Sequence, residues 1–72
     1  MSNVNEFKNI LAVKLVSVYL LSPEMARTIV EESAVNKMLN LDDDARDWQM
    51  HQPLDYTVES IYREYKGLPI EL

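Results

Sequence analysis

Three side chains that could hold a metal ion or move protons stand at helical spacing in the second half of the chain. Asp44, Asp47 and His51 occupy positions i, i+3 and i+7, so a helix through this segment would place them on one face. Two carboxylates and an imidazole suit a transition-metal ion. A lone His near a helix C-terminus has a simpler structural explanation, because the negative helix end favours its charge. We therefore predict no metal and no other cofactor, while the sequence leaves metal binding by these three residues open.

The acidic run that begins at Asp42 resembles the start of a calcium-binding loop only in its first two ligand positions. The sixth position of such a loop needs Gly for a sharp turn, and the twelfth needs a bidentate Glu. Counted from Asp42, these positions hold Asp47 and Pro53. Carboxylates are stabilised at the start of a helix by its partial positive charge. The run therefore predicts a helix N-terminus rather than a calcium site.

Hydrolytic chemistry lacks the groups that it needs. A nucleophilic mechanism requires an activated Ser, Cys or Thr beside a base that a third group orients. The chain has one His and no Cys, and Ser22 is placed as a helix cap. A carboxylate pair needs a cleft that separates two pKa values, and a short helical chain with a single Gly offers little material for one. We expect no catalytic residues and no enzymatic activity.

Large side chains suited to protein contacts concentrate in the second half of the chain. Trp, Tyr and Met are enriched in interface cores because they combine a large apolar area with a polar or pliable end. Trp48 lies outside any long apolar stripe, whereas Tyr62 and Tyr65 recur at helical spacing and are better explained as core residues. Together with one face of the first predicted helix, the candidate partner-binding residues are Phe7, Leu11, Leu15, Val18, Trp48, Met50, His51 and Tyr56.

Prolines and the single glycine divide the chain into segments of helical length. The predicted helices cover residues 4–21, 23–41 with a bend near Glu32 and Ser33, 45–52, and a last helix that Asp55 caps and Gly67 ends. In the second helix the apolar side is predicted to contain Ala26, Ile29, Val30, Ala34, Met38 and Leu41. The fold class is all-α, a single domain over residues 1–72 built as a bundle of three to four helices, with 68–72 as an extended C-terminal tail.

The first predicted helix is apolar nearly all round, because Ile10, Val13 and Val16 fall outside the stripe that begins at Phe7. The alternation Leu11, Val13, Leu15 would also suit a buried strand, so a partly extended segment stays open. A domain of 72 residues buries only about 60% of its unfolded surface, and without Cys it cannot use disulfides. We therefore expect a homodimer that associates through the first helix.

The charge balance narrows the class of partner. The net charge is −5, and residues 37–72 hold eight of the twelve acidic residues but four of the seven basic ones. Nucleic-acid binding depends on Lys and Arg, so we expect no nucleic-acid partner and favour a basic protein surface. The apolar run at residues 10–21 contains Lys14 and is shorter than the roughly 18 residues of a membrane span. We therefore expect neither a membrane-spanning helix nor a signal peptide. The lack of Cys fits a reducing compartment, and we expect the protein in the cytoplasm.

An alternative interpretation is a transcriptional regulator with a degenerate helix-turn-helix between residues 22 and 41. The recognition helix of this motif would cover residues 33–39. Glu31 and Glu32 would then stand at the turn, where Gly is frequent, and Lys37 alone could meet a phosphate. This alternative therefore has weaker support than protein binding.

The order of features resembles a family of short uncharacterised bacterial helical proteins that are encoded near ADP-ribosyltransferase-like toxins. An apolar first helix, the segment LSPEMARTIVEESAV, a short acidic stretch and HQPLDYTVESIYREY carry the resemblance. Within the last segment, His51, Tyr56, Val58, Glu59 and Ile61 match a family-like pattern, whereas the spacing between the second and third helices departs from it. The resemblance implies an antitoxin or accessory role. We therefore expect a non-catalytic protein-interaction module that binds a partner protein.

Overall fold

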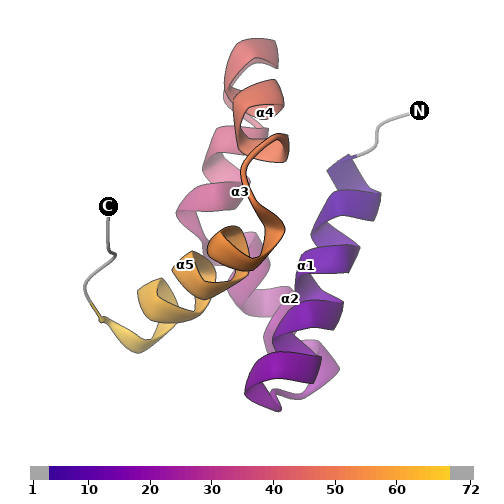
Figure 1. Cartoon of the computed structure of the whole chain (residues 1–72), viewed down its shortest axis with the longest axis vertical. Coiled ribbons are helices and arrows are strands. Elements are labelled where there is room, and N and C mark those ends of the chain that lie inside the picture. The colour runs from indigo at the N-terminus through magenta and orange to yellow at the C-terminus, as the bar shows by residue number, and fades with distance from the viewer. Residues whose placement is uncertain (1–3, 69–72) are drawn as a thin grey trace.

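Five helices make up most of the computed structural model, which describes residues 4–68. They are α1 (Val4–Tyr19), α2 (Pro23–Glu32), α3 (Ala34–Leu39), α4 (Asp43–Met50) and α5 (Leu54–Lys66). Helix α1 lies against α2 and α5, both α2 and α5 contact α3, and α4 packs chiefly on α3 (Figure 1). The shortest dimension is 19 Å, about two helix diameters. The predicted all-α class is confirmed, but there are five helices in the described residues rather than three to four.

The first segment is a helix throughout, so the strand alternative does not hold. Helix α1 ends at Tyr19, two residues earlier than predicted, because the chain must reverse before Pro23. Leu20 adopts a left-handed φ of 57°, and Ser22 is extended with ψ of 152°, as the residue before a proline prefers. The Ser22 hydroxyl then accepts a hydrogen bond from the Met25 amide at 3.2 Å and caps α2.

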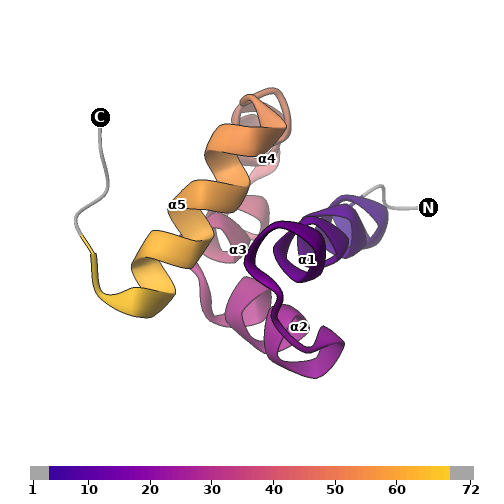
Figure 2. The same cartoon turned by 60° about the horizontal axis from the view of Figure 1, so that its bottom comes forward.

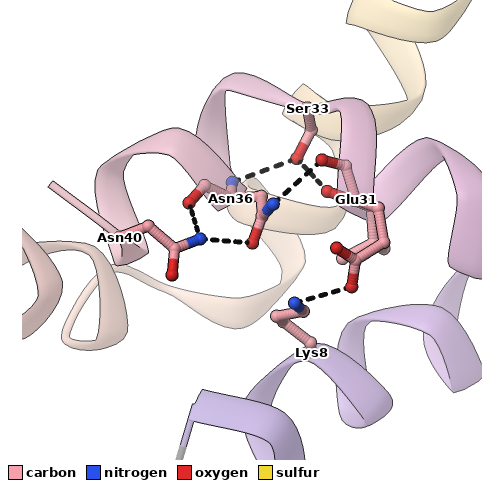
Figure 3. Close-up of polar contacts among 6 residues, drawn as sticks. Lys8, Glu31, Ser33, Asn36 and Asn40 are labelled. Carbon is pink, nitrogen blue, oxygen red and sulfur yellow. Dashed lines mark hydrogen bonds and ion pairs between the residues drawn. The ribbon is translucent and has the colours of Figure 1, made fainter.

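Ser33 divides the predicted second helix into α2 and α3 (Figure 3). Its backbone is extended, with ψ of 159°. Its buried hydroxyl donates to the Val30 carbonyl at 2.7 Å and accepts from the Asn36 amide at 3.2 Å. One side chain therefore closes α2 and opens α3. The bend expected near this residue is a complete helix break, which accounts for the additional helix.

The break at Ser33 also changes which residues of the following helix reach the core. A continuous helix would bury Ala34 and Leu41, but both are exposed. Val35 and Leu39 are buried in their place, with exposed fractions of 6% and 0%. The apolar side predicted for residues 23–41 is therefore right for Ala26, Ile29 and Val30, and beyond the break it is wrong for Ala34 and Leu41. Met38 is half-buried.

Local capping determines the ends of the two last helices. The Asp42 carboxylate accepts from the Ala45 amide at 2.8 Å, so α4 begins at Asp43, earlier than predicted. Asp55 is not the cap of α5, because the helix begins at Leu54 and Asp55 lies within its first turn. Gly67, with φ of 71°, ends α5 as predicted, and the Leu68 amide donates to the Arg63 carbonyl at 2.8 Å. Of the predicted tail, residues 69–72 lie outside the described residues.

The core lies between α1, α2, α3 and α5. Leu11, Leu15 and Leu39 are fully buried, and Ile61 of α5 is 1% exposed. At one edge the rings of Tyr19 and Tyr62 stack with centroids 3.8 Å apart. Tyr65, which we predicted in the core, is 45% exposed.

A salt bridge adds a polar contact beside this core. Helix α1 lies against α2 (Figure 2), and at this contact the Lys8 ammonium and the Glu31 carboxylate pair at 2.6 Å (Figure 3). The Lys8 side chain is 18% exposed and the Glu31 side chain 57%, so only the Lys8 end of the pair is shielded from water.

We expect Ser33→Ala to lower the free energy of unfolding by about 1–2 kcal/mol. The substitution removes the cap of α3 and the hydrogen bond that the hydroxyl donates to the Val30 carbonyl of α2. Urea denaturation followed by circular dichroism measures this. Thr28→Ala, at an exposed position within α2, is the matched control and should not destabilise the protein. Equal effects of the two substitutions would contradict the proposed role of Ser33.

Burial raises the pKa of the Tyr19 phenol above its ordinary value of 10.0, and the negative charge of Glu59 raises it further. The folded state therefore holds this proton more tightly than the unfolded state, and the stabilisation is lost as the pH rises above 10.0. The difference in unfolding free energy between wild type and Tyr19→Phe should be constant near neutral pH. Above pH 10.0 this difference should shift in favour of the Tyr19→Phe variant. A difference that does not depend on pH would contradict the raised pKa of Tyr19.

Candidate protein-interaction surface

Helix α4 is held on α3 by its inner side. The Arg46 guanidinium donates through Nε to the Leu39 carbonyl at 3.0 Å and through Nη1 to Oδ1 of Asp43 at 2.9 Å. Gln49, on the same side, is 6% exposed. The Asp43 contact lies within α4, whereas the bond to Leu39 and the burial of Gln49 fix the side of α4 that faces α3 and therefore determine which residues face outward.

The outward side of α4 presents one aromatic ring among charged groups. Asp44, Asp47, Trp48 and His51 are all exposed and stand at positions i, i+3, i+4 and i+7. We call these four residues the α4 outer face. Trp48 is 56% exposed, which is unusual for so large an apolar group. The face therefore offers an indole for burial, with two carboxylates beside it that attract positive charge.

His51 ends α4 and its ring is already oriented. Its Nδ1 lies 2.7 Å from the Asp47 carbonyl oxygen. Because a carbonyl oxygen can only accept a hydrogen bond, Nδ1 is the donor in this contact. Although Asp44, Asp47 and His51 share one face, no group of three His, Cys, Asp or Glu side chains in the span 4–68 could hold a metal ion.

The remaining candidates divide between core and surface. Leu11 and Leu15 are 0% exposed and belong to the core, so they cannot contact a partner in this conformation. Phe7 and Met50 are half-buried against the same core. Tyr56 is 43% and Val18 58% exposed, so both can be reached from solvent. The stripe that begins at Phe7 is thus chiefly the buried side of α1.

The partner-binding residues predicted from the sequence do not include the apolar residues that α1 turns outward. Ile10 and Val13 are 46% and 57% exposed. The signal was present, because both residues fall outside the stripe of Phe7, Leu11 and Leu15 at helical spacing. Since the whole segment is apolar, however, spacing alone does not say which of its two sides faces the core.

Two carboxylates also line a small depression of about 240 Å³ between α2 and α5, namely those of Glu32 and Glu64. The Glu64 carboxylate accepts from the Ala34 amide with both oxygens, at 3.0 and 3.1 Å, and so stabilises the start of α3. This carboxylate has a structural role that joins α5 to α3, and the depression gives no ground for acid–base chemistry.

The segment considered for a helix-turn-helix has a different geometry from that motif. A single residue, Ser33, joins α2 to α3, whereas the motif uses a turn of three to four residues. Helix α3 spans six residues, and Lys37 is its one basic residue. No observation therefore favours the regulator alternative over protein binding.

Comparisons with known proteins return no relative. No protein family, curated protein or solved structure matches the chain. Within residues 4–68, none of the helices combines the length and apolarity needed to cross a membrane.

We expect Trp48→Ala to change the free energy of unfolding by less than about 1 kcal/mol, because much of the ring is already in contact with water. Leu39→Ala, on the neighbouring helix and fully buried, should lower it by about 2–5 kcal/mol. Thermal and urea denaturation of the two variants compare the values. A loss at Trp48 as large as that at Leu39 would show that the indole stabilises the fold.

Proposed function

We propose that this protein acts by binding another protein through the α4 outer face, without catalysing a reaction. The observation that carries the proposal is the exposed indole of Trp48, which stands among Asp44, Asp47 and His51 on a helix that packs chiefly on α3. Exposed Trp side chains are among the residues that contribute most binding energy when a partner covers them.

The charges of this face indicate a basic partner. A Lys or Arg of the partner can lie over the indole and interact with its π face, within reach of the two carboxylates. Arg can in addition form two parallel hydrogen bonds to a carboxylate. The net charge of −5 would speed the encounter with such a surface.

This proposal extends to the role implied by the family resemblance. An antitoxin-like protein has to cover a site on a toxin-like enzyme, and an acidic helix with an aromatic anchor is chemically suited to cover a basic one. We place this activity in the bacterial cytoplasm, in keeping with the resemblance and with a chain that has no Cys.

Affinity capture from the cell that makes the protein tests the proposal. Wild type should recover a basic protein in stoichiometric amount, and Trp48→Ala should reduce the recovery at least about tenfold because it removes the anchor. The pair Asp44→Asn with Asp47→Asn should reduce it as well, and recovery by wild type should fall as salt is raised because the contact is partly ionic.

Two control variants match these changes elsewhere on the surface. Glu24→Gln with Glu32→Gln alters the net charge equally but lies on α2, and Tyr65→Ala removes a ring that is 45% exposed on α5. Both should retain the partner. If all variants lose it equally, or if Trp48→Ala keeps it, the α4 outer face is not the binding site.

A further inference from the structure

Helix α1 presents a second surface, of different character, on the side away from the core. Glu6, Ile10 and Val13 are exposed there, together with the half-buried Lys14 and the exposed Ser17. We call these five residues the α1 outward face. Residues spaced by three or four lie on the same side of a helix, and each of these five residues has such a neighbour in the set. They therefore form one continuous surface. The face combines two exposed apolar side chains with one residue of each charge.

The charges of this face are arranged for pairing with a copy of itself. Glu6 precedes Ile10 by four residues and Lys14 follows it by four, so opposite charges flank Ile10 one helical turn away on either side. The face is neutral as a whole, although the chain carries −5. Two copies that meet here therefore bring together complementary charges, whereas two α4 outer faces would bring together carboxylates.

We propose that the chain forms a homodimer in which the α1 helices of two copies cross antiparallel, with the twofold axis near Ile10. Four residues correspond to about 6 Å along a helix, so Glu6 of one copy comes level with Lys14 of the partner subunit, and Lys14 with Glu6 of the partner subunit. Rows of residues spaced by four interdigitate in the commonest class of helix packing, with axes about 8–10 Å apart. Lys and Glu side chains can span that separation, and Ile10 and Val13 become buried between the helices.

The residues of the face are available for this contact. Lys14 approaches Asp55 at 3.9 Å, but the two side chains are 43% and 94% exposed, so that pair is weak and can exchange. Ser17 is small and lets a second helix come near. A groove of about 210 Å³ between α1 and α2, lined by residues that include Val13, Val16 and Pro23, adjoins the face and extends the contact area.

The dimer goes beyond the proposed function and uses a different helix from it. The two can therefore fail separately: loss of self-association leaves the α4 outer face intact, and loss of the heterologous partner leaves the dimer intact.

Charge exchange across the twofold axis tests the proposal. Sedimentation equilibrium of the full chain from about 1 to about 200 μM should show a wild-type dimer. Lys14→Glu places Glu against Glu at both contacts, and Glu6→Lys places Lys against Lys, so each should weaken the dimer at least about tenfold. The double variant restores both pairs and should dimerise again, and an equimolar mixture of the single variants should form heterodimers.

Matched controls separate these pairs from charge in general. Lys37→Glu and Glu24→Lys make the same changes on α3 and α2, and Asp55→Asn removes the internal contact of Lys14; all three should dimerise like wild type. Circular dichroism confirms that each variant is folded. A monomeric wild type throughout the range would overturn the proposal, and so would single charge variants that dimerise like wild type.

Discussion

The arrangement of this small protein depends on the hydroxyl of Ser33. By bonding to the carbonyl of Val30 and the amide of Asn36, it ends one helix and begins the next with no loop between them. The second helix can then take its own direction and bury Val35 and Leu39. Helix α4 stacks chiefly on this short helix, so the position of the exposed indole of Trp48 follows from the Ser33 break.

A limited core explains why apolar side chains remain outside. A domain of this size has too little interior to cover every side of its most apolar helix. Helix α1 uses Leu11 and Leu15 for the core and leaves Ile10 and Val13 exposed. Such residues are normal on a surface when isolated, but here they share a face with Glu6 and Lys14, whose opposite charges give that face a preferred orientation toward a copy of itself.

The two proposed surfaces differ mainly in charge, and charge determines which partner each one suits. The α4 outer face carries carboxylates around an aromatic ring and repels its own copy, so it suits a basic surface of another protein. The α1 outward face is neutral and self-complementary. A dimer through α1 would present two copies of the α4 outer face, and binding to a partner with two matching sites would then gain from the linkage.

Sequence alone determined the features that arise from neighbouring residues. The all-α class, the cap at Ser22, the acidic start of α4 and the stop at Gly67 could all be predicted, because each depends on hydrogen bonds within one helical turn. The exposure of Trp48 could also be anticipated, because this residue lies outside any long apolar stripe in the sequence. Asp55 shows the limit of such local prediction. We expected it to cap the last helix, but the helix begins one residue earlier, at Leu54.

Only the tertiary structure decided which faces are buried. Spacing could not choose between the two apolar sides of α1, and the choice of Leu11 and Leu15 rather than Ile10 and Val13 came from packing against α2 and α5. The same holds after Ser33, where a single extended residue moved the buried positions to Val35 and Leu39. Burial is settled by contacts between segments far apart in the chain, and those contacts leave no local pattern in the sequence.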